Sequence, residues 1–242
     1  MLPASLPRLL FAHRKSGHIT GQGTSTWAVV AAAGSGERLG AEQPKAFVRL
    51  GELPLLAESV RRLEESAWVD AIVIAAPPGW EEPAILLAEE LGCGKVSACV
   101  TGGATRAESV RLALAEVPED AVVVVVHDAA RPFLPEEVLE RVLTALGEGW
   151  DGAVPGLPIA DTVKRVEDDR VVETLDRSAL VIVQTPQAFL APVLRRAVEL
   201  GEGTDCSSLV ERAGGRVTVV PGDPRLVKVT TKAELELVES WL

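Results

Sequence analysis

Cysteine is scarce in this sequence, and its placement excludes two kinds of site. The 242 residues include three cysteines, Cys93, Cys99 and Cys206, an odd number with no Cys-x-x-Cys spacing. A disulfide framework or a structural zinc site requires paired, regularly spaced ligands. We therefore expect three reduced thiols in a cytoplasmic protein.

Positive charge is also in short supply. The chain has 24 Lys and Arg residues against 35 Asp and Glu residues, which gives a formal net charge of -11 at pH 7. Nonspecific binding to nucleic acids or to anionic membranes needs an extended basic surface. The composition excludes both classes, so any phosphate-binding site must be a local basic pocket in an acidic protein.

Long apolar runs are absent as well. No stretch is long enough to span a membrane, and the run Leu-Leu-Phe-Ala at residues 9–12 is too short for the core of a secretory signal. We expect residues 1–26 to form a disordered leader or to reflect an upstream start codon. Residues 27–242 are then the folded domain.

Apolar residues make up 47% of the chain, which is enough for one large domain or two small ones. Strand-like apolar runs alternate with helical segments, and the valine run is the strongest strand signal. The four runs are residues 27–30, 71–76, 96–100 and 122–126. This alternation predicts an α/β fold with an open, mostly parallel sheet and helices on both faces, in which ligands bind at the carboxyl ends of the strands.

The alternation is interrupted between residues 158 and 186. Residues 161–166 and 170–175 form two short strand-like segments with too little apolar surface to be stable alone. We expect a protruding β-arm that packs on another body, often a second copy of the chain. The remaining segments return to the earlier pattern, with helices at 194–200 and 207–213, strands at 217–220 and 226–229, and a capped terminal helix.

A glycine-rich loop, AAAGSGERLGAEQPK at residues 31–45, follows the first strand-like run. Gly34 and Gly36 can adopt backbone angles closed to other residues, so that peptide N–H groups approach an anion. Arg38 and Lys45 would add positive charge. The loop therefore suits a polyphosphate, although the same pattern also fits a tight turn with surface Arg and Lys.

Two better-known phosphate motifs do not fit this loop. A P-loop ends in Lys-Ser or Lys-Thr, which is absent here. A dinucleotide fingerprint needs a third glycine where the chain has Leu39, with Gly40 one residue late, and no acidic ribose ligand follows the second strand-like run. Both alternatives are disfavoured.

Two further turns are predicted at the same edge of the sheet. Gly102 and Gly103 follow the third strand-like run, and Thr105 with Glu108 form a capping box that opens a helix. His-Asp-Ala-Ala-Arg-Pro at residues 127–132 follows the valine run. In a parallel sheet these turns lie beside the glycine-rich loop.

The motifs together resemble one family. In chain order they are AAAGSGERLGAEQPKAF, GGATRAESV, VVHDAARPF, ADTVKR, TLDR, QTPQAF, TDCSSLVE and VKVT. Their order and spacing are similar to those of the bacterial 2-C-methyl-D-erythritol 4-phosphate cytidylyltransferases, over about residues 27–242. The resemblance implies a Rossmann-like nucleotidyltransferase fold with a dimerisation arm at about residues 158–186.

The resemblance also implies a reaction. CTP and 2-C-methyl-D-erythritol 4-phosphate would give CDP-methylerythritol and pyrophosphate, with Mg²⁺, in the non-mevalonate isoprenoid pathway. Both reacting groups are anions, so catalysis would come mainly from positioning and charge neutralisation. A homodimer is implied as well.

The residues that match the family's site fall into three groups. Arg38, Lys45 and Lys228 are implied to stabilise the triphosphate, and Asp128 to hold the metal and line the substrate pocket. The implied nucleotide-binding residues are Ala32, Ala33, Gly34, Gly36, Gly102, Gly103, Arg106 and Ser109. The implied substrate-binding residues are Asp128, Arg131, Thr162, Arg177 and Thr185, with Thr162 and Arg177 acting across the dimer.

Simpler roles exist for several of these residues. Lys228 would otherwise be a solvated lysine at a strand end, Asp128 a helix cap and Arg106 a helix-surface residue. His127 has no metal-ligand cluster, so packing or hydrogen bonding in the loop is its better interpretation. Two positions depart from the family pattern, since Ala104 and Cys206 stand where relatives commonly carry polar and acidic residues.

Three other functions fit parts of the same sequence. A cytidylyltransferase for another polyol phosphate, such as ribitol 5-phosphate, would use the same scaffold and differ around the arm and residues 161–164. A non-catalytic nucleotide-binding protein would not need the full set of charged residues. A dinucleotide-binding domain is disfavoured by the departures from its fingerprint.

Overall fold

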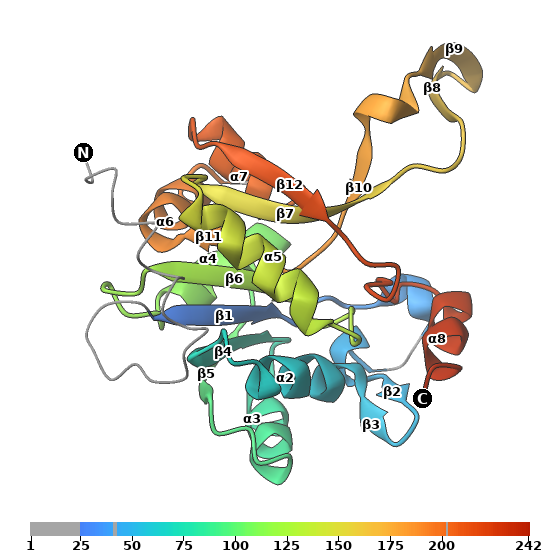
Figure 1. The fold of residues 1–242 in the computed structure, drawn as a ribbon. Coiled ribbons are helices and arrows are strands. Elements are labelled where there is room, and N and C mark those ends of the chain that lie inside the picture. The colour runs from blue at the N-terminus through green and yellow to red at the C-terminus, as the bar shows by residue number, and fades with distance from the viewer. Residues whose placement is uncertain (1–24, 41–42, 202) are drawn as a thin grey trace.

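The computed structural model describes residues 25–40, 43–201 and 203–242 (Figure 1). The predicted leader lies outside the described residues except for its last two positions, one of which, Thr26, begins the first strand. In the described part of the chain, no helix combines the length and apolar character needed to cross a membrane.

The central sheet has eight strands in the order β10-β7-β11-β6-β1-β4-β5, with β12 pairing along β7. β1 runs parallel to β4 and β6, β4 runs parallel to β5, and β12 runs parallel to β7. β10 and β11 run antiparallel to the strands with which they pair. The strands are β1 Thr26–Ala31, β4 Ala71–Ala76, β5 Val96–Thr101, β6 Val123–Asp128, β7 Gly152–Pro158, β10 Val181–Val183, β11 Gln187–Leu190 and β12 Val217–Pro221. The predicted mostly parallel sheet is confirmed.

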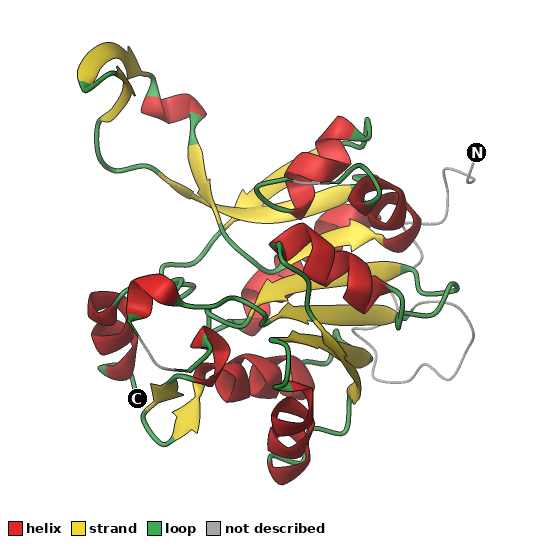
Figure 2. Cartoon of the chain, turned by 180° about the vertical axis from the view of Figure 1, so that it is seen from behind, coloured by secondary structure: helices red, strands yellow, loops and turns green. Residues whose placement is uncertain are grey.

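Helices cover both faces of this sheet, as the views from the two sides show (Figures 1 and 2). The helices are α2 Leu55–Glu65, α3 Glu81–Glu90, α4 Arg106–Leu114, α5 Glu136–Gly147, α6 Ala191–Val198, α7 Cys206–Arg212 and α8 Lys232–Glu239. α2, α3 and α5 pack on one face, while α4, α6 and α7 pack on the other.

The valine strand β6 shows why the apolar runs have no polar alternation. Val123 and Val125 belong to the core cluster under α2 and α5, while Val124 and Val126 belong to the cluster under α4 and α6. Successive side chains of a strand point to opposite faces, so a strand covered on both sides is apolar throughout.

A third, smaller core joins the end of the chain to the glycine-rich loop. This core consists of Leu39, Val48, Leu50, Leu55, Val229 and Val238 of α8. Leu50 lies on β2 (Arg49–Leu50), which contacts α8 and pairs with β3 (Leu53–Pro54) in a hairpin. This packing holds residues 226–230 beside the 127–132 turn.

The strand predicted at residues 226–229 is wrong. Leu226 and Val229 are fully buried, but in two different core clusters. The backbone N–H of Leu226 donates to Asp223 in a turn, and that of Val229 donates to Ala130. The segment therefore forms no strand, and its apolar pattern reflects the burial of Leu226 and Val229 in the two clusters.

The predicted β-arm is present as β8 (Val163–Glu167) and β9 (Arg170–Leu175), an antiparallel hairpin that projects from the body (Figure 1). Asp168 and Asp169 both have positive φ, as two-residue hairpin turns require. Val166, Val171 and Val172 of the hairpin are exposed. The arm has no core of its own in this chain.

Candidate active site

The site lies where the order of the strands reverses. The chain runs outward from β1 to β4 and β5, then crosses back to place β6 on the other side of β1. The last residues of these two central strands, Ala31 and Asp128, are register partners. A cavity of about 740 Å³ opens at this switch point, where open α/β sheets bind their ligands.

The glycine-rich loop forms one wall of the cavity. Gly36 has φ of 76°, and a Cβ at this position would stand 2.7 Å from Cβ of Lys45. Glycine is therefore required twice, for the left-handed backbone and for the close passage of Lys45. Lys45 opens a short 3-10 helix whose Ala46 and Phe47 are buried, which fixes the lysine at the cavity.

The turn after β5 forms the opposite wall. A Cβ on Gly102 would collide with that of Ala33, so the two loops touch because this residue is glycine.

Ser109 is buried in the helix that follows this turn, and its hydroxyl accepts from Gly103 N at 3.0 Å and donates to Thr105 O at 2.9 Å. The cap on Glu108 N is formed by Thr105, whereas the Glu108 carboxylate accepts from Ala104 N. Ser109 thus shapes the turn.

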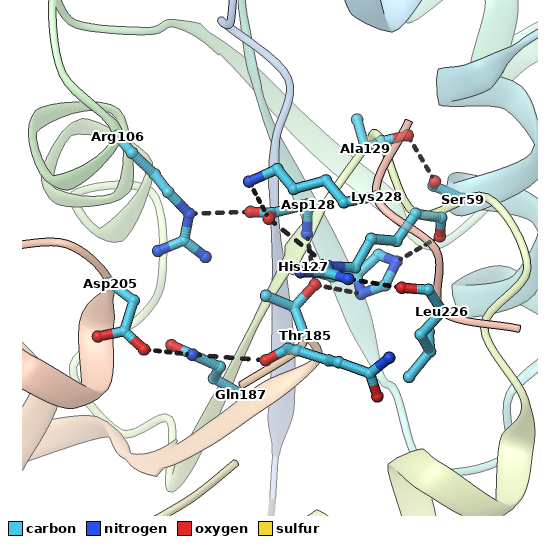
Figure 3. Close-up of polar contacts among 12 residues, drawn as sticks. Ser59, Arg106, His127, Asp128, Ala129, Thr185, Gln187, Asp205, Leu226 and Lys228 are labelled. Atoms are coloured by element: carbon cyan, nitrogen blue, oxygen red, sulfur yellow. Dashed lines mark hydrogen bonds and ion pairs between the residues drawn. The ribbon is translucent and has the colours of Figure 1, made fainter. Parts of the chain in front are cut away.

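Asp128 is the centre of the charged cluster (Figure 3). Its Oδ1 accepts from Nε of Arg106 at 2.8 Å, and its Oδ2 accepts from Nζ of Lys228 at 2.8 Å. Nε of Arg131 lies 3.8 Å from Oδ2. The buried Nη2 of Arg106 has no hydrogen-bond partner among the described residues, so it is available to an incoming ligand.

The electrostatics of the cavity favour anions. Burial raises the pKa of Asp128, but the charges of Arg106, Lys228 and Arg131 outweigh it and hold that pKa well below its usual range. Burial, followed by repulsion from Lys228, lowers the pKa of Lys45 to about 8. The Asp128 carboxylate is therefore ionised, and the cavity lining carries three basic residues against two acidic ones, Asp128 and Glu37, in a protein of net negative charge.

His127 and Thr185 lie beneath Asp128 and are buried. Nε2 of His127 is 3.0 Å from the carbonyl oxygen of Arg131, and its Nδ1 is 3.2 Å from the Thr185 hydroxyl. That hydroxyl accepts from the backbone N–H of Asp128 at 3.1 Å. Burial lowers the pKa of His127 to about 4. The prediction that His127 forms hydrogen bonds in the loop is confirmed.

Most of the predicted site residues meet at the cavity. Its lining includes Ala32, Ala33, Gly34, Lys45, Gly102, Gly103, Arg106, Ser109, Asp128 and Lys228. Gly36 lies behind Lys45, and Arg38 is exposed on the adjoining 3-10 helix. The repulsion from Arg38 also contributes to the lowered pKa of Lys45, so the two side chains act on the same region.

The remaining predicted residues lie elsewhere. Thr162 and Arg177 are exposed on the arm, where Nη1 of Arg177 donates to Ala160 O. Nη1 of Arg131 donates to Leu226 O at 2.5 Å, which leaves Nε toward Asp128. The Thr185 hydroxyl is directed to the protein, as described above.

Sequence reasoning missed two supports of the cluster. Ser59 lies on the buried face of α2 and donates to Ala129 O at 2.9 Å, which anchors the turn after β6. A serine in line with Leu56 and Leu63 was the available signal. Sγ of Cys206, fully buried at the start of α7, lies 3.4 Å from Nη1 of Arg106. The thiol contacts the guanidinium without adding a second negative charge.

The described residues contain no group of three or more His, Cys, Asp or Glu that could hold a metal ion by themselves. Asp128 is the buried, ionised carboxylate of the cavity, whose lining also includes the exposed Glu37. One carboxylate suits Mg²⁺, which usually takes its other ligands from phosphate oxygens and water. Since Arg106 and Lys228 already contact both oxygens, the ion would have to share Asp128 with them when phosphates are bound.

Comparison with known proteins identifies the family. The family model described as 2-C-methyl-D-erythritol 4-phosphate cytidylyltransferase matches residues 26–242. The chain belongs to this cytidylyltransferase family. A family member from Saccharopolyspora erythraea is 48% identical over 224 residues, which cover 90% of this chain and 99% of that protein. One from Frankia casuarinae is 46% identical over 218 residues, covering 89% and 80%. The resemblance noted in the motifs is confirmed.

Solved structures of cytidylyltransferases share the fold. A crystal structure of 4-diphosphocytidyl-2C-methyl-D-erythritol synthase has a TM-score of 0.77 at 32% identity and covers 90% of this chain and 99% of its own. The 2-C-methyl-D-erythritol 4-phosphate cytidylyltransferase from Thermus thermophilus has a TM-score of 0.72 at 32% identity, with coverage of 88% and 96%. The structural similarity therefore extends over most of this chain and nearly all of each solved chain.

Proposed function

We propose that this protein transfers a cytidylyl group from CTP to 2-C-methyl-D-erythritol 4-phosphate and releases pyrophosphate, as a step of the non-mevalonate isoprenoid pathway. The observation that carries the proposal is the cluster of Lys45, Arg106 and Lys228 around ionised Asp128 at the switch point. It is a local cationic pocket in an acidic chain, which is what a reaction between two anions needs.

The cavity walls suggest how CTP binds. The loop at Ala32 and Ala33 touches the Gly102–Gly103 turn, and we assign the peptide groups of these two loops to the cytosine ring and ribose. Peptide N–H groups around Gly34 and Gly36, with Lys45 and Arg38, then face the triphosphate. In this proposal the α-phosphorus of CTP lies toward Lys228 and Arg106.

The chemical step is an in-line displacement. A phosphate oxygen of the polyol phosphate forms a bond to the α-phosphorus of CTP, and the bond from that phosphorus to the pyrophosphate oxygen breaks. Negative charge increases on the leaving pyrophosphate, where Lys45 and Arg38 neutralise it. Lys228 and the free Nη2 of Arg106 bring the two anions together, and Asp128 holds these cations in place.

Mg²⁺ is the proposed metal. It would be held by Asp128 together with phosphate oxygens, and it would supply further neutralisation of charge on the triphosphate. The dependence of turnover on Mg²⁺ is measured by adding increasing Mg²⁺ to protein that has been treated with a chelator. Half-maximal turnover should require more Mg²⁺ when Asp128 is replaced.

The reaction itself is tested by pyrophosphate release with CTP and a panel of polyol phosphates. We expect turnover with 2-C-methyl-D-erythritol 4-phosphate. No release with this substrate alongside release with ribitol 5-phosphate would replace the proposed substrate by the other polyol phosphate.

A pH dependence follows from Lys45. Its pKa of about 8 means that the amino group loses its charge as the pH rises through that value, so kcat/KM for CTP should fall above pH 8. The substrate phosphate, with a second pKa of about 6, is already fully ionised there. Lys45→Arg keeps its charge and should lack the fall, at a lower rate. If kcat/KM of Lys45→Arg decreases above pH 8 as it does in the unaltered protein, the decrease is due to another group.

We also propose that the arm completes a second subunit's site in a homodimer. Thr162 and Arg177 are exposed and are not among the residues that line this chain's cavity, and the valines of the hairpin are exposed in the single chain. A partner that buries Val166, Val171 and Val172 would account for both features.

Mixed dimers test the shared site. In a heterodimer of Arg177→Ala and Lys45→Ala subunits, one of the two sites receives an intact Lys45 and an intact arm, so activity should return. A heterodimer of Lys45→Ala and Asp128→Asn subunits is the matched control, because each cavity then carries one defect. Equal inactivity of both verified heterodimers would contradict the exchange of arms.

A further inference from the structure

We propose that His127 is a positioning residue, which fixes the Thr185 hydroxyl as an acceptor for the backbone of Asp128 and so holds the carboxylate in its cationic cluster. The inference rests on the proposed function and assigns Thr185 to the protein side of the site. The resemblance to the family implied a substrate contact for Thr185, so the two assignments make different predictions.

The ring of His127 has only one consistent tautomer. Its Nε2 lies 3.0 Å from the carbonyl oxygen of Arg131, which can only accept a hydrogen bond. The proton of the neutral ring is therefore on Nε2, and Nδ1 carries a bare lone pair. The ring is fully buried at the end of β6, so no solvent competes for either nitrogen.

The direction of the Thr185 hydrogen bonds follows. Nδ1 of His127 is 3.2 Å from the Thr185 oxygen and has no proton, so the hydroxyl must donate to it. The same oxygen accepts from the N–H of Asp128 at 3.1 Å. A threonine hydroxyl has one proton, and this proton is donated to Nδ1 of His127. Buried Thr185 thus has no proton to donate to a phosphate.

The sheet shows why a side chain is needed at this point. β11 pairs with β6 in a register that sets Gln187 opposite Val126, so continuing it by two residues sets Thr185 opposite Asp128. β11 begins only at Gln187, and Pro186 has no N–H to contribute. The Thr185 hydroxyl takes the place of a backbone acceptor and satisfies the last N–H of β6.

The hydrogen bond between the Asp128 N–H and the Thr185 hydroxyl connects the returning segment of the arm to the charged cluster. Thr185 lies on the segment that returns from the arm, and Asp128 holds Arg106 and Lys228. The other end of the His127 ring holds the carbonyl of Arg131, whose guanidinium also faces Asp128. His127 therefore sets the backbone on both sides of the carboxylate and is not itself one of the residues that line the cavity.

The first test reads the tautomer directly. In ¹⁵N-histidine-labelled protein at pH 7, long-range ¹H–¹⁵N correlation spectra should show His127 protonated at Nε2 and bare at Nδ1. The His127 signals are assigned by their loss in His127→Asn, since the other histidines are His13 and His18. Protonation at Nδ1 would overturn the proposal. The measurement needs no turnover, so it stands apart from the proposed function.

The second test uses variants that separate the two ends of the ring. His127→Asn retains an acceptor near the position of Nδ1, and His127→Gln retains a donor near that of Nε2. Thr185→Val removes the hydroxyl at nearly constant shape, while Thr185→Ser retains it. We expect Thr185→Val to lower kcat by about ten-fold with little change in KM for the polyol phosphate, and Thr185→Ser to restore most of the rate.

The double variant completes the test. Because both residues act through one hydrogen-bonded unit, Thr185→Val combined with His127→Gln should lose no more rate than the more damaging single change. Additive losses, or a KM increase for the polyol phosphate in Thr185→Val with kcat unchanged, would make Thr185 a direct substrate contact and refute the proposal. Absence of turnover in the unaltered protein would instead refute the proposed function, and the tautomer would still be read.

Discussion

Asp128→Asn should lower turnover by at least about 10²-fold, because the carboxylate holds Arg106 and Lys228 at the reacting centre. Arg106 and Lys228 each contact one of its oxygens at 2.8 Å. An amide has one oxygen and one N–H₂ group, so it cannot accept from both cations and turns a donor toward one of them. The remaining positive charges then repel one another across the cavity.

The same change should reduce stability. Removing one partner of a buried ion pair costs about 3–5 kcal/mol, and we expect the lower end because Lys228 is 38% exposed. The sign follows from the depressed pKa of Asp128, since a carboxyl that is more acidic when folded stabilises the fold wherever it is ionised. Denaturant unfolding gives the stability, and kcat is measured at a temperature where the variant is folded.

Asp223→Asn provides the matched control for Asp128→Asn. Asp223 pairs with Arg225 at 2.9 Å at the surface and takes no part in the cavity lining. Its replacement should cost at most about 1 kcal/mol, as surface ion pairs do, with an unchanged rate. Turnover by Asp128→Asn within a factor of three of the unaltered protein would exclude its central role.

The fold was predictable from the sequence where local signals agree with the tertiary packing. The valine run, the helix predicted at residues 207–213 and the glycines after the first and third strand-like runs are examples, because at each the local preference agrees with the observed packing. The strand prediction at residues 226–229 was wrong because Leu226 and Val229 are buried in two separate core clusters. The apolar pattern of the sequence does not reveal that one segment contributes to both clusters. Strand pairing depends on neighbours that are distant in sequence.

The site was predictable in outline for a related reason. Loops after parallel strands meet at one edge of a sheet, which brings Gly34, Gly102 and Asp128 together without knowledge of any side-chain contact. The pairing of Arg106 with Asp128 and its contact with Cys206 span 22 and 100 residues of sequence, so only the packing of α4 against α7 and β6 reveals them. The tautomer of His127 has no sequence signal at all.

Lys45→Ala should lower kcat/KM by about 10²- to 10³-fold, the usual effect of removing one preorganised donor from a transition state with growing negative charge. The lysine is held at the cavity by the buried Ala46 and Phe47 and by the close passage of Gly36. Alanine keeps the backbone and Cβ and removes the rest of the side chain with its charged amino group. The loss should therefore fall on catalysis.

Stability should respond to Lys45→Ala in the opposite direction to Asp128→Asn. Burial and repulsion from Lys228 lower the pKa of Lys45 on folding, so the folded state disfavours the charged amine; this penalty applies in full below pH 8 and decreases as the pH rises from about 8 to 10.5. Removing the amine relieves its repulsion with Lys228, and Tm at pH 7 should be equal or higher. Functional sites commonly carry groups that cost stability in this way.

Lys232→Ala is the control for the removal of a lysine, because Lys232 is exposed at the start of α8 and outside the cavity lining. We expect it to keep both rate and Tm within error. A Lys45→Ala variant with the full rate, or one that loses rate only in proportion to a fall in Tm, would show that Lys45 supports the loop and does not act on the phosphates. A lower rate with an undiminished Tm is the result that assigns it to catalysis.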